Sequence, residues 1–181
     1  MKKTISAKNL AFCALCIALC VVLPMAFHSI QNAGAIFCPM HIPVLLCGLL
    51  VGWPYGLLCG LAGPLLSSLL TGMPAMGYLP CMMVELGAYG LLCGLFMKFV
   101  RTGKIYADLY ISLVGGLLIG VIAGLFRALI FSPGSYSLAA WATGYFVTCL
   151  PGLVIQLVLV PSIVFALMKA RLVPMRYPAK H

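Results

Sequence analysis

The sequence predicts an all-α membrane protein in which six helices cross the bilayer and both ends of the chain lie in the cytoplasm. Two observations lead to this fold class: six long apolar runs, and the placement of 11 Lys and Arg against 2 Asp and Glu. Of the 181 residues, 64% are hydrophobic and 7% are charged, with a mean hydropathy of +1.18. A soluble domain of this size does not have such a composition. We therefore expect a single integral membrane domain over residues 1–181.

The six apolar runs give the expected helices. Each is roughly 17–24 residues long, enough to cross the hydrocarbon core at about 1.5 Å per residue. Pro54 and its flanking glycines divide the run 36–71 into two short spans. Pro39 and Pro43 predict an irregular or partly helical stretch at 38–41. The expected spans are 10–27, 36–52, 55–71, 79–99, 109–132 and 145–168.

The positive charges set the orientation. Six crossings place both chain ends on one side, and all but one of the Lys and Arg residues fall on that side. The opposite loops contain no Lys, Arg, Asp or Glu. The positive-inside rule makes the basic side cytoplasmic, so the net charge of +9 is a topology signal rather than a nucleic-acid-binding stripe. The residues are Lys2, Lys3, Lys8, Lys98, Arg101, Lys104, Lys169, Arg171, Arg176 and Lys180.

Small residues recur at helical spacing in several spans. Because lipid removes the hydrophobic drive for helix association, close backbone approach across small residues holds such helices together. We therefore expect a tight bundle. The repeated glycines are Gly48, Gly52, Gly56 and Gly60, then Gly90 and Gly94, then Gly116, Gly120 and Gly124.

The first span carries a stripe of four alanines, Ala7, Ala11, Ala14 and Ala18. At about 100° per residue they project within an arc of roughly 60°. The stripe either packs against another helix of the same chain or forms a docking groove for a separate membrane subunit.

The sequence lacks the residues of an ATPase or an acid/base enzyme. No phosphate-binding G-x-x-x-x-G-K-[ST] motif occurs, since Gly103-Lys104 is followed by Ile105. The two carboxylates, Glu85 and Asp108, are expected near opposite faces of the membrane, which excludes a two-carboxylate mechanism. We expect no enzyme and no cofactor.

One redox alternative stays open. Cys13 and Cys16 have the C-x-x-C spacing of redox-active dithiols. They lie in the cytoplasmic half of a lipid-embedded helix, where cysteine also packs as a small apolar residue.

Glu85 and Arg127 are the leading candidate site residues. Both are expected roughly 7–10 Å below the outer surface, on the fourth and fifth spans. An ionisable group in hydrocarbon costs about 2.5–3.5 kcal/mol and is expected to face the protein interior. The two either form a structural ion pair or bind a substrate.

Polar and aromatic residues near that depth complete a candidate pocket. Tyr89 lies one turn below Glu85 on the same helix face. Several of these residues also have structural interpretations: Trp141 and Tyr145 as interfacial anchors, His41 as a hydrogen-bonding partner beside two prolines, and Gln156 as interhelical glue. The expected substrate-binding set is Asn32, His41, Glu85, Tyr89, Arg127, Trp141 and Gln156.

The order of motifs resembles a known transporter family. The motifs begin with the segment Pro39-Met-His-Ile-Pro-Val-Leu-Leu-Cys-Gly-Leu-Leu-Val-Gly52. They continue with Tyr55-Gly56, Gly60 and Pro64, and then with Leu70-Thr-Gly-Met-Pro74 and Glu85-Leu-Gly-Ala-Tyr-Gly90. With the alanine stripe and no ATPase motif, this pattern resembles the substrate-binding S component of energy-coupling factor (ECF) transporters, in the vitamin-uptake branch.

The resemblance implies a function and partners. Such S components lie in the prokaryotic plasma membrane and bind a vitamin or precursor from outside. They associate with a transmembrane coupling subunit and two ATPases, and rotate in the bilayer to release the ligand inward. The family's A-x-x-x-A coupling motif corresponds to Ala14 and Ala18, with Ala7 and Ala11 extending it.

The resemblance leaves the ligand open. A pantothenate-like carboxylate is the first candidate, because Arg127 is the one cation in the outer half and can bind a carboxylate in bidentate fashion. Thiamin precursors and pyridoxine-like compounds remain open, since Glu85 would suit a basic ring.

Metal uptake is a further alternative. Met40-His41-Ile42-Pro43 is similar to the Met-His-Ile start of cobalt and nickel S components, where the free N-terminal amine is a ligand. Here the motif is internal and has no free amine.

Overall fold

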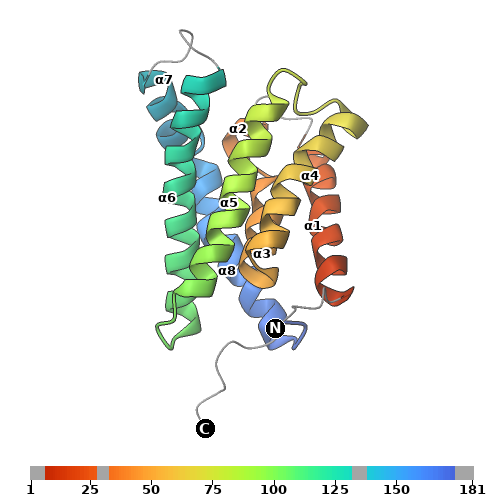
Figure 1. Ribbon diagram of the computed structural model, residues 1–181, viewed down its shortest axis with the longest axis vertical. Helices are drawn as coiled ribbons and strands as arrows, with labels where there is room; N and C mark the ends of the chain where they lie inside the picture. The colour runs from red at the N-terminus through yellow and green to blue at the C-terminus, as the bar shows by residue number, and fades with distance from the viewer. Residues whose placement is uncertain (1–6, 28–32, 132–137, 174–181) are drawn as a thin grey trace.

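The computed structural model describes residues 7–27, 33–131 and 138–173, and these residues form a bundle of helices with no strand among them (Figure 1). Six segments of this described part are long and apolar enough to cross a membrane, which confirms the predicted fold class. The elements are α1 (Ala7–Ala26), α2 (Ala33–Phe37), α3 (His41–Val51), α4 (Trp53–Thr71), α5 (Leu79–Phe99), α6 (Ile105–Phe131), α7 (Leu138–Thr143), the π-helical turn η1 (Gly144–Thr148) and α8 (Leu150–Lys169).

The second predicted span is broken where its prolines indicated. Residues 38–40 separate α2 from α3, and Cys38 has a φ of 47°. Gly52 ends α3 with a φ of 111°, in a region that favours glycine, and α4 starts at the next residue. The chain therefore reverses direction between α3 and α4 within one residue.

Apart from the broken second span, four helix starts differ from the sequence prediction. Helix α4 begins at Trp53 rather than 55. Helix α1 begins at Ala7 rather than 10, and α6 at Ile105 rather than 109, because backbone hydrogen bonding continues past the charged residues that end an apolar run. The sixth span was expected from 145, but α8 begins at Leu150. Pro151 in its first turn has no N–H to bond to the preceding turn, which separates α8 from η1.

The two ends of the bundle differ in charge. The start of α1, the α5–α6 turn and the end of α8 lie at one end (Figure 1). Asp108 closes the α5–α6 turn there, because its Oδ1 accepts hydrogen bonds from the Thr102 N–H and hydroxyl, each 2.7 Å long. The opposite end holds α2, the α4–α5 loop and α7. Among residues with described side chains, all the Lys and Arg residues belong to the first end: Lys8, Lys98, Arg101, Lys104, Lys169 and Arg171.

Glycine contacts bring α3 and α4 against α5. A Cβ atom added to Gly48 or Gly56 would meet the Gly90 carbonyl oxygen, and one added to Gly60 would meet the Leu86 carbonyl group. The backbones touch directly, as expected for small-residue packing in a membrane.

Helix α6 uses its glycines to accommodate larger groups. Added Cβ atoms would meet the Cys93 thiol at Gly116, the Tyr89 ring at Gly120 and the Tyr145 hydroxyl at Gly124. Two of these three partners are tyrosines of the site described below.

Helix α1 has two distinct faces. Cys13, Cys16 and Cys20 are buried in a core cluster with Cys47, Cys59 and their neighbours from α3, α4 and α5. The alanine stripe is exposed at all four positions, so it does not pack against another described helix of the chain. The described helices therefore leave the stripe uncovered.

Candidate functional site

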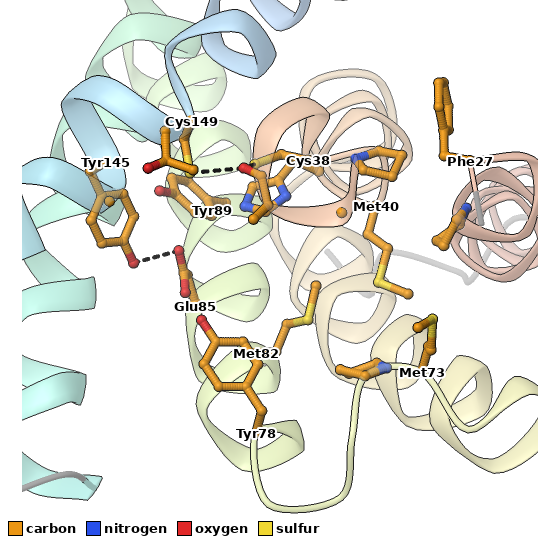
Figure 2. Close-up of a pocket in the computed structure, with 18 of the residues that line it drawn as sticks. Phe27, Cys38, Met40, Met73, Tyr78, Met82, Glu85, Tyr89, Tyr145 and Cys149 are labelled. Atoms are coloured by element: carbon orange, nitrogen blue, oxygen red, sulfur yellow. Dashed lines mark hydrogen bonds between the residues drawn. The ribbon is translucent and has the colours of Figure 1, made fainter. Parts of the chain in front are cut away.

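A cavity of about 530 Å³ lies at the end of the bundle opposite the basic residues. Its wall is built from the end of α1, α2, the start of α3, the α4–α5 loop, the first turns of α5, η1 and the start of α8. Figure 2 shows these segments converging on one space. Its volume is within the usual range for small-molecule sites, about 300–1,000 Å³.

Glu85 and Tyr145 form the polar side of the cavity. Tyr145 Oη donates a hydrogen bond of 2.6 Å to Glu85 Oε1 (Figure 2). Glu85 is 7% exposed, so this short bond forms away from bulk water. The bond requires Gly124, since a larger residue there would displace the Tyr145 hydroxyl.

His41 and Tyr89 lie deeper along the same wall. Their ring centroids are 5.1 Å apart, and Tyr89 is fully buried against Gly120 of α6. His41 Nδ1 is buried and has no hydrogen-bond partner within the described structure.

Gln156 contributes an amide from α8. Its side chain is 1% exposed, and the carbonyl oxygen has no hydrogen-bond partner among the described residues. Buried polar atoms are normally paired, so an unpaired one in a cavity wall is a candidate ligand contact.

Much of the remaining wall is sulfur and aromatic carbon. Met40, Met73 and Met82 come from three different segments, and Phe27 and Tyr78 add rings. The loop that carries Met73 is held by α4, because the Ser68 hydroxyl donates a 2.7 Å hydrogen bond to the Pro74 carbonyl.

Two thiols, from the α2–α3 break and the start of α8, also line the cavity. Cys38 and Cys149 both donate to the Ala35 carbonyl oxygen, with sulfur–oxygen distances of 3.3 and 3.2 Å. The shared acceptor ties the α2–α3 break to the start of α8 (Figure 2).

The structure brings four of the seven expected binding residues to the cavity: His41, Glu85, Tyr89 and Gln156. Trp141 does not line it. Its Nε1 donates to the Val121 carbonyl at 3.2 Å and its ring lies 6.0 Å from that of Tyr145, so it packs behind the site. Arg127 belongs to α6, but its side chain lies outside the described residues, as does the whole of Asn32.

Sequence reasoning missed Tyr145 and the methionines as site residues. Tyr145 was interpreted as an interfacial anchor, which a tyrosine near a helix end usually is. Its inward direction follows from the π-helical turn, and no sequence pattern indicated such a turn. The clustering of Met40, Met73 and Met82 depends on tertiary packing alone.

Neither alternative chemistry gains support from the geometry. In the described ranges, no three His, Cys, Asp or Glu side chains gather so as to hold a metal ion. Cys13 and Cys16 are 1% and 2% exposed within the α1 core contact, and neither lines the cavity.

The comparison with protein families identifies the chain. Residues 8–164 match the family described as the ECF transporter substrate-specific component. The chain belongs to this family. No curated protein and no solved structure matches it. This S component is therefore a multi-pass membrane protein that binds the small-molecule substrate of an ECF transporter, and it works with a membrane and ATPase module rather than as an enzyme.

Proposed function

We propose that this S component captures a vitamin or vitamin precursor from outside the cell, in the cavity around Glu85 and Tyr145, for ATP-driven import. The observation that carries the proposal is the position of that cavity at the end remote from the basic residues. Under the positive-inside rule the basic end faces the cytoplasm, so the cavity faces the exterior.

The composition of the cavity suits a small molecule with few polar groups. A mainly apolar wall with a few fixed hydrogen-bonding groups is the usual character of such sites. Glu85, His41 and Gln156 supply those groups from three different helices. Their convergence fixes the orientation of a ligand.

Pantothenate remains the candidate that Arg127 favours. Arg127 lies three residues beyond Gly124, whose backbone packs against Tyr145. A guanidinium can bind a carboxylate in bidentate fashion. Glu85 favours ligands of the opposite kind, such as thiamin precursors or pyridoxine-like compounds.

The exposed alanine stripe of α1 is the proposed docking surface for the coupling subunit. The stripe is smooth, and the opposite face of the helix is fixed in the core by Cys13, Cys16 and Cys20. Small residues allow a partner helix to approach closely within the bilayer. Two ATPases then supply the energy that this chain has no motif to generate.

Two experiments test these assignments. Native mass spectrometry of protein purified without added ligand should detect a bound vitamin-sized molecule. Ala14→Trp should leave that binding intact and abolish uptake in cells that contain the coupling subunit and ATPases. Leu118→Trp, on an exposed face of α6, is the control and should transport normally. Normal uptake by Ala14→Trp would remove the docking assignment.

A further inference from the structure

The apolar part of the cavity wall has an unusual composition for this chain. Leucine is the commonest residue of the sequence, yet Leu153 is the one branched aliphatic residue among the described lining residues. Three of the 10 methionines line the cavity. Thioether sulfur is polarisable and makes favourable contacts with aromatic rings. The wall is therefore better matched to a flat ring than to a branched aliphatic chain.

The aromatic residues of the cavity wall also favour a flat ligand. Phe27, Tyr78, Tyr89 and Tyr145 approach the cavity from four segments. Aromatic pairs favour offset-stacked or edge-to-face arrangements, which a planar ligand can adopt against several walls at once. Figure 2 shows Met82 and Met40 between the Tyr78 and Phe27 sides of the cavity.

Two unpaired polar atoms in the cavity wall indicate which hydrogen-bonding groups a planar ligand must carry on its edge. The Gln156 carbonyl oxygen accepts only, so it requires a donor, whereas His41 Nδ1 accepts or donates according to its tautomer. Leaving either atom buried and unpaired is costly. The Glu85 carboxylate, bound by Tyr145, is a further acceptor in the same cavity.

We infer that the substrate is a planar nitrogen heterocycle bearing N–H or amino groups, with its faces against methionine and tyrosine side chains and its donor edge toward Gln156 and His41. The inference rests on the proposed function and narrows it. An aliphatic hydroxy acid of the pantothenate type leaves the ring contacts unused.

The test uses the full-length protein in lipid nanodiscs. The molecule released on denaturation is identified by mass and ultraviolet spectrum. Binding is then measured for three probes: pyridoxamine, 4-amino-5-hydroxymethyl-2-methylpyrimidine and pantothenate. We expect a released molecule with a nitrogen ring, and tighter binding of at least one ring probe than of pantothenate.

Two near-isosteric variants connect the result to the wall. Gln156→Leu should weaken binding of the released heterocycle about tenfold, as expected for one lost hydrogen bond in a closed site. Met82→Leu should weaken it about threefold. Met25→Leu, on the exposed face of α1, is the control and should bind as the wild type does. If Gln156→Leu does not fold, the inference is tested by the identity of the released molecule and by the affinity of Met82→Leu for it.

The possible failures are distinguishable. Two outcomes overturn this inference and leave vitamin capture in place. One is a released acid without a ring. The other is a released molecule that binds the Gln156 and Met82 variants as tightly as it binds the wild type. A wild-type protein that releases nothing and binds none of the three probes refutes the proposed function, and this inference with it.

Discussion

Tyr145 donates a 2.6 Å hydrogen bond to Glu85 across 60 residues of sequence, joining the π-helical turn η1 to α5. The two residues form the polar side of the cavity, and both are buried. The bond fixes the carboxylate in one direction. A variant that keeps the ring but loses the hydroxyl therefore isolates its contribution.

Tyr145→Phe should weaken ligand binding about tenfold and lower the free energy of unfolding by about 1–2 kcal/mol, because the buried carboxylate loses a donor. Calorimetric titration with the released ligand and thermal unfolding measure the two effects. Tyr106→Phe is the matched control, since that tyrosine is exposed. Unchanged affinity in Tyr145→Phe would show that the hydroxyl does not orient Glu85 for binding.

Gly124→Ala should reproduce the binding defect of Tyr145→Phe without touching the tyrosine. The added methyl group would meet the Tyr145 hydroxyl and displace it from Glu85. Such overpacking typically costs about 1–3 kcal/mol. Gly115→Ala in the same helix is the control, because its methyl group would be in ordinary contact with the Phe96 ring, 3.4 Å away. Equal affinities of the two variants would contradict the prediction.

Gly90→Ala should destabilise the protein as a whole. Its methyl group would meet the Gly56 carbonyl oxygen, and backbone cannot move aside as a flexible side chain can. We expect a loss of about 3 kcal/mol or more, at the upper end for overpacking. Thermal unfolding in detergent measures it. Gly77→Ala, where the methyl group has no neighbour within 4 Å, should unfold like the wild type.

Arg127→Ala should lower ligand affinity without loss of the folded protein. An ionisable residue at this depth is expected to face a site or a partner rather than lipid. Titration of the released ligand measures the affinity, and size-exclusion chromatography reports folding. Arg101→Ala, in the turn at the basic end, should have no effect. A folded Arg127→Ala protein with full affinity would remove this residue from the binding set.

Cys149 should be the thiol that an impermeant maleimide reaches from outside, because it lines the cavity and is part-exposed. Saturating ligand should protect it, and Cys149→Ser should lose the label, as read by intact-protein mass spectrometry. The pair Cys13→Ser with Cys16→Ser is the control, since both thiols are buried, and uptake should be unaffected. If saturating ligand does not reduce the maleimide labelling of Cys149, this residue lies outside the binding site.

The parts of the fold that depend on local pattern could be predicted from the sequence. The lengths of the apolar runs predicted the six spans. Pro39 and Pro43 predicted the break before α3, and Pro54 with Gly52 predicted the turn before α4. The glycine repeats predicted tight packing. The sequence does not say which partner each glycine meets, because that depends on helix rotation.

The candidate site could be predicted only in part, for the same physical reason. Glu85, His41 and Gln156 stood out because polar groups in hydrocarbon are costly. Tyr145 did not, since its direction is set by a π-helical turn, and Trp141 was assigned to the pocket although it packs on the outer side of Tyr145. Methionine in a membrane span gives no signal that separates a cavity wall from ordinary packing.

The glycine contacts between α4 and α5 have a consequence for how related proteins can diverge. The residues that hold these two helices together do not line the cavity, whereas α2, the α4–α5 loop and η1 are short pieces that supply much of its wall. Substitutions in the short pieces alter which molecule fits without disturbing the helix contact. One scaffold can thus acquire new ligand preferences while keeping the surface of α1 that faces away from its core.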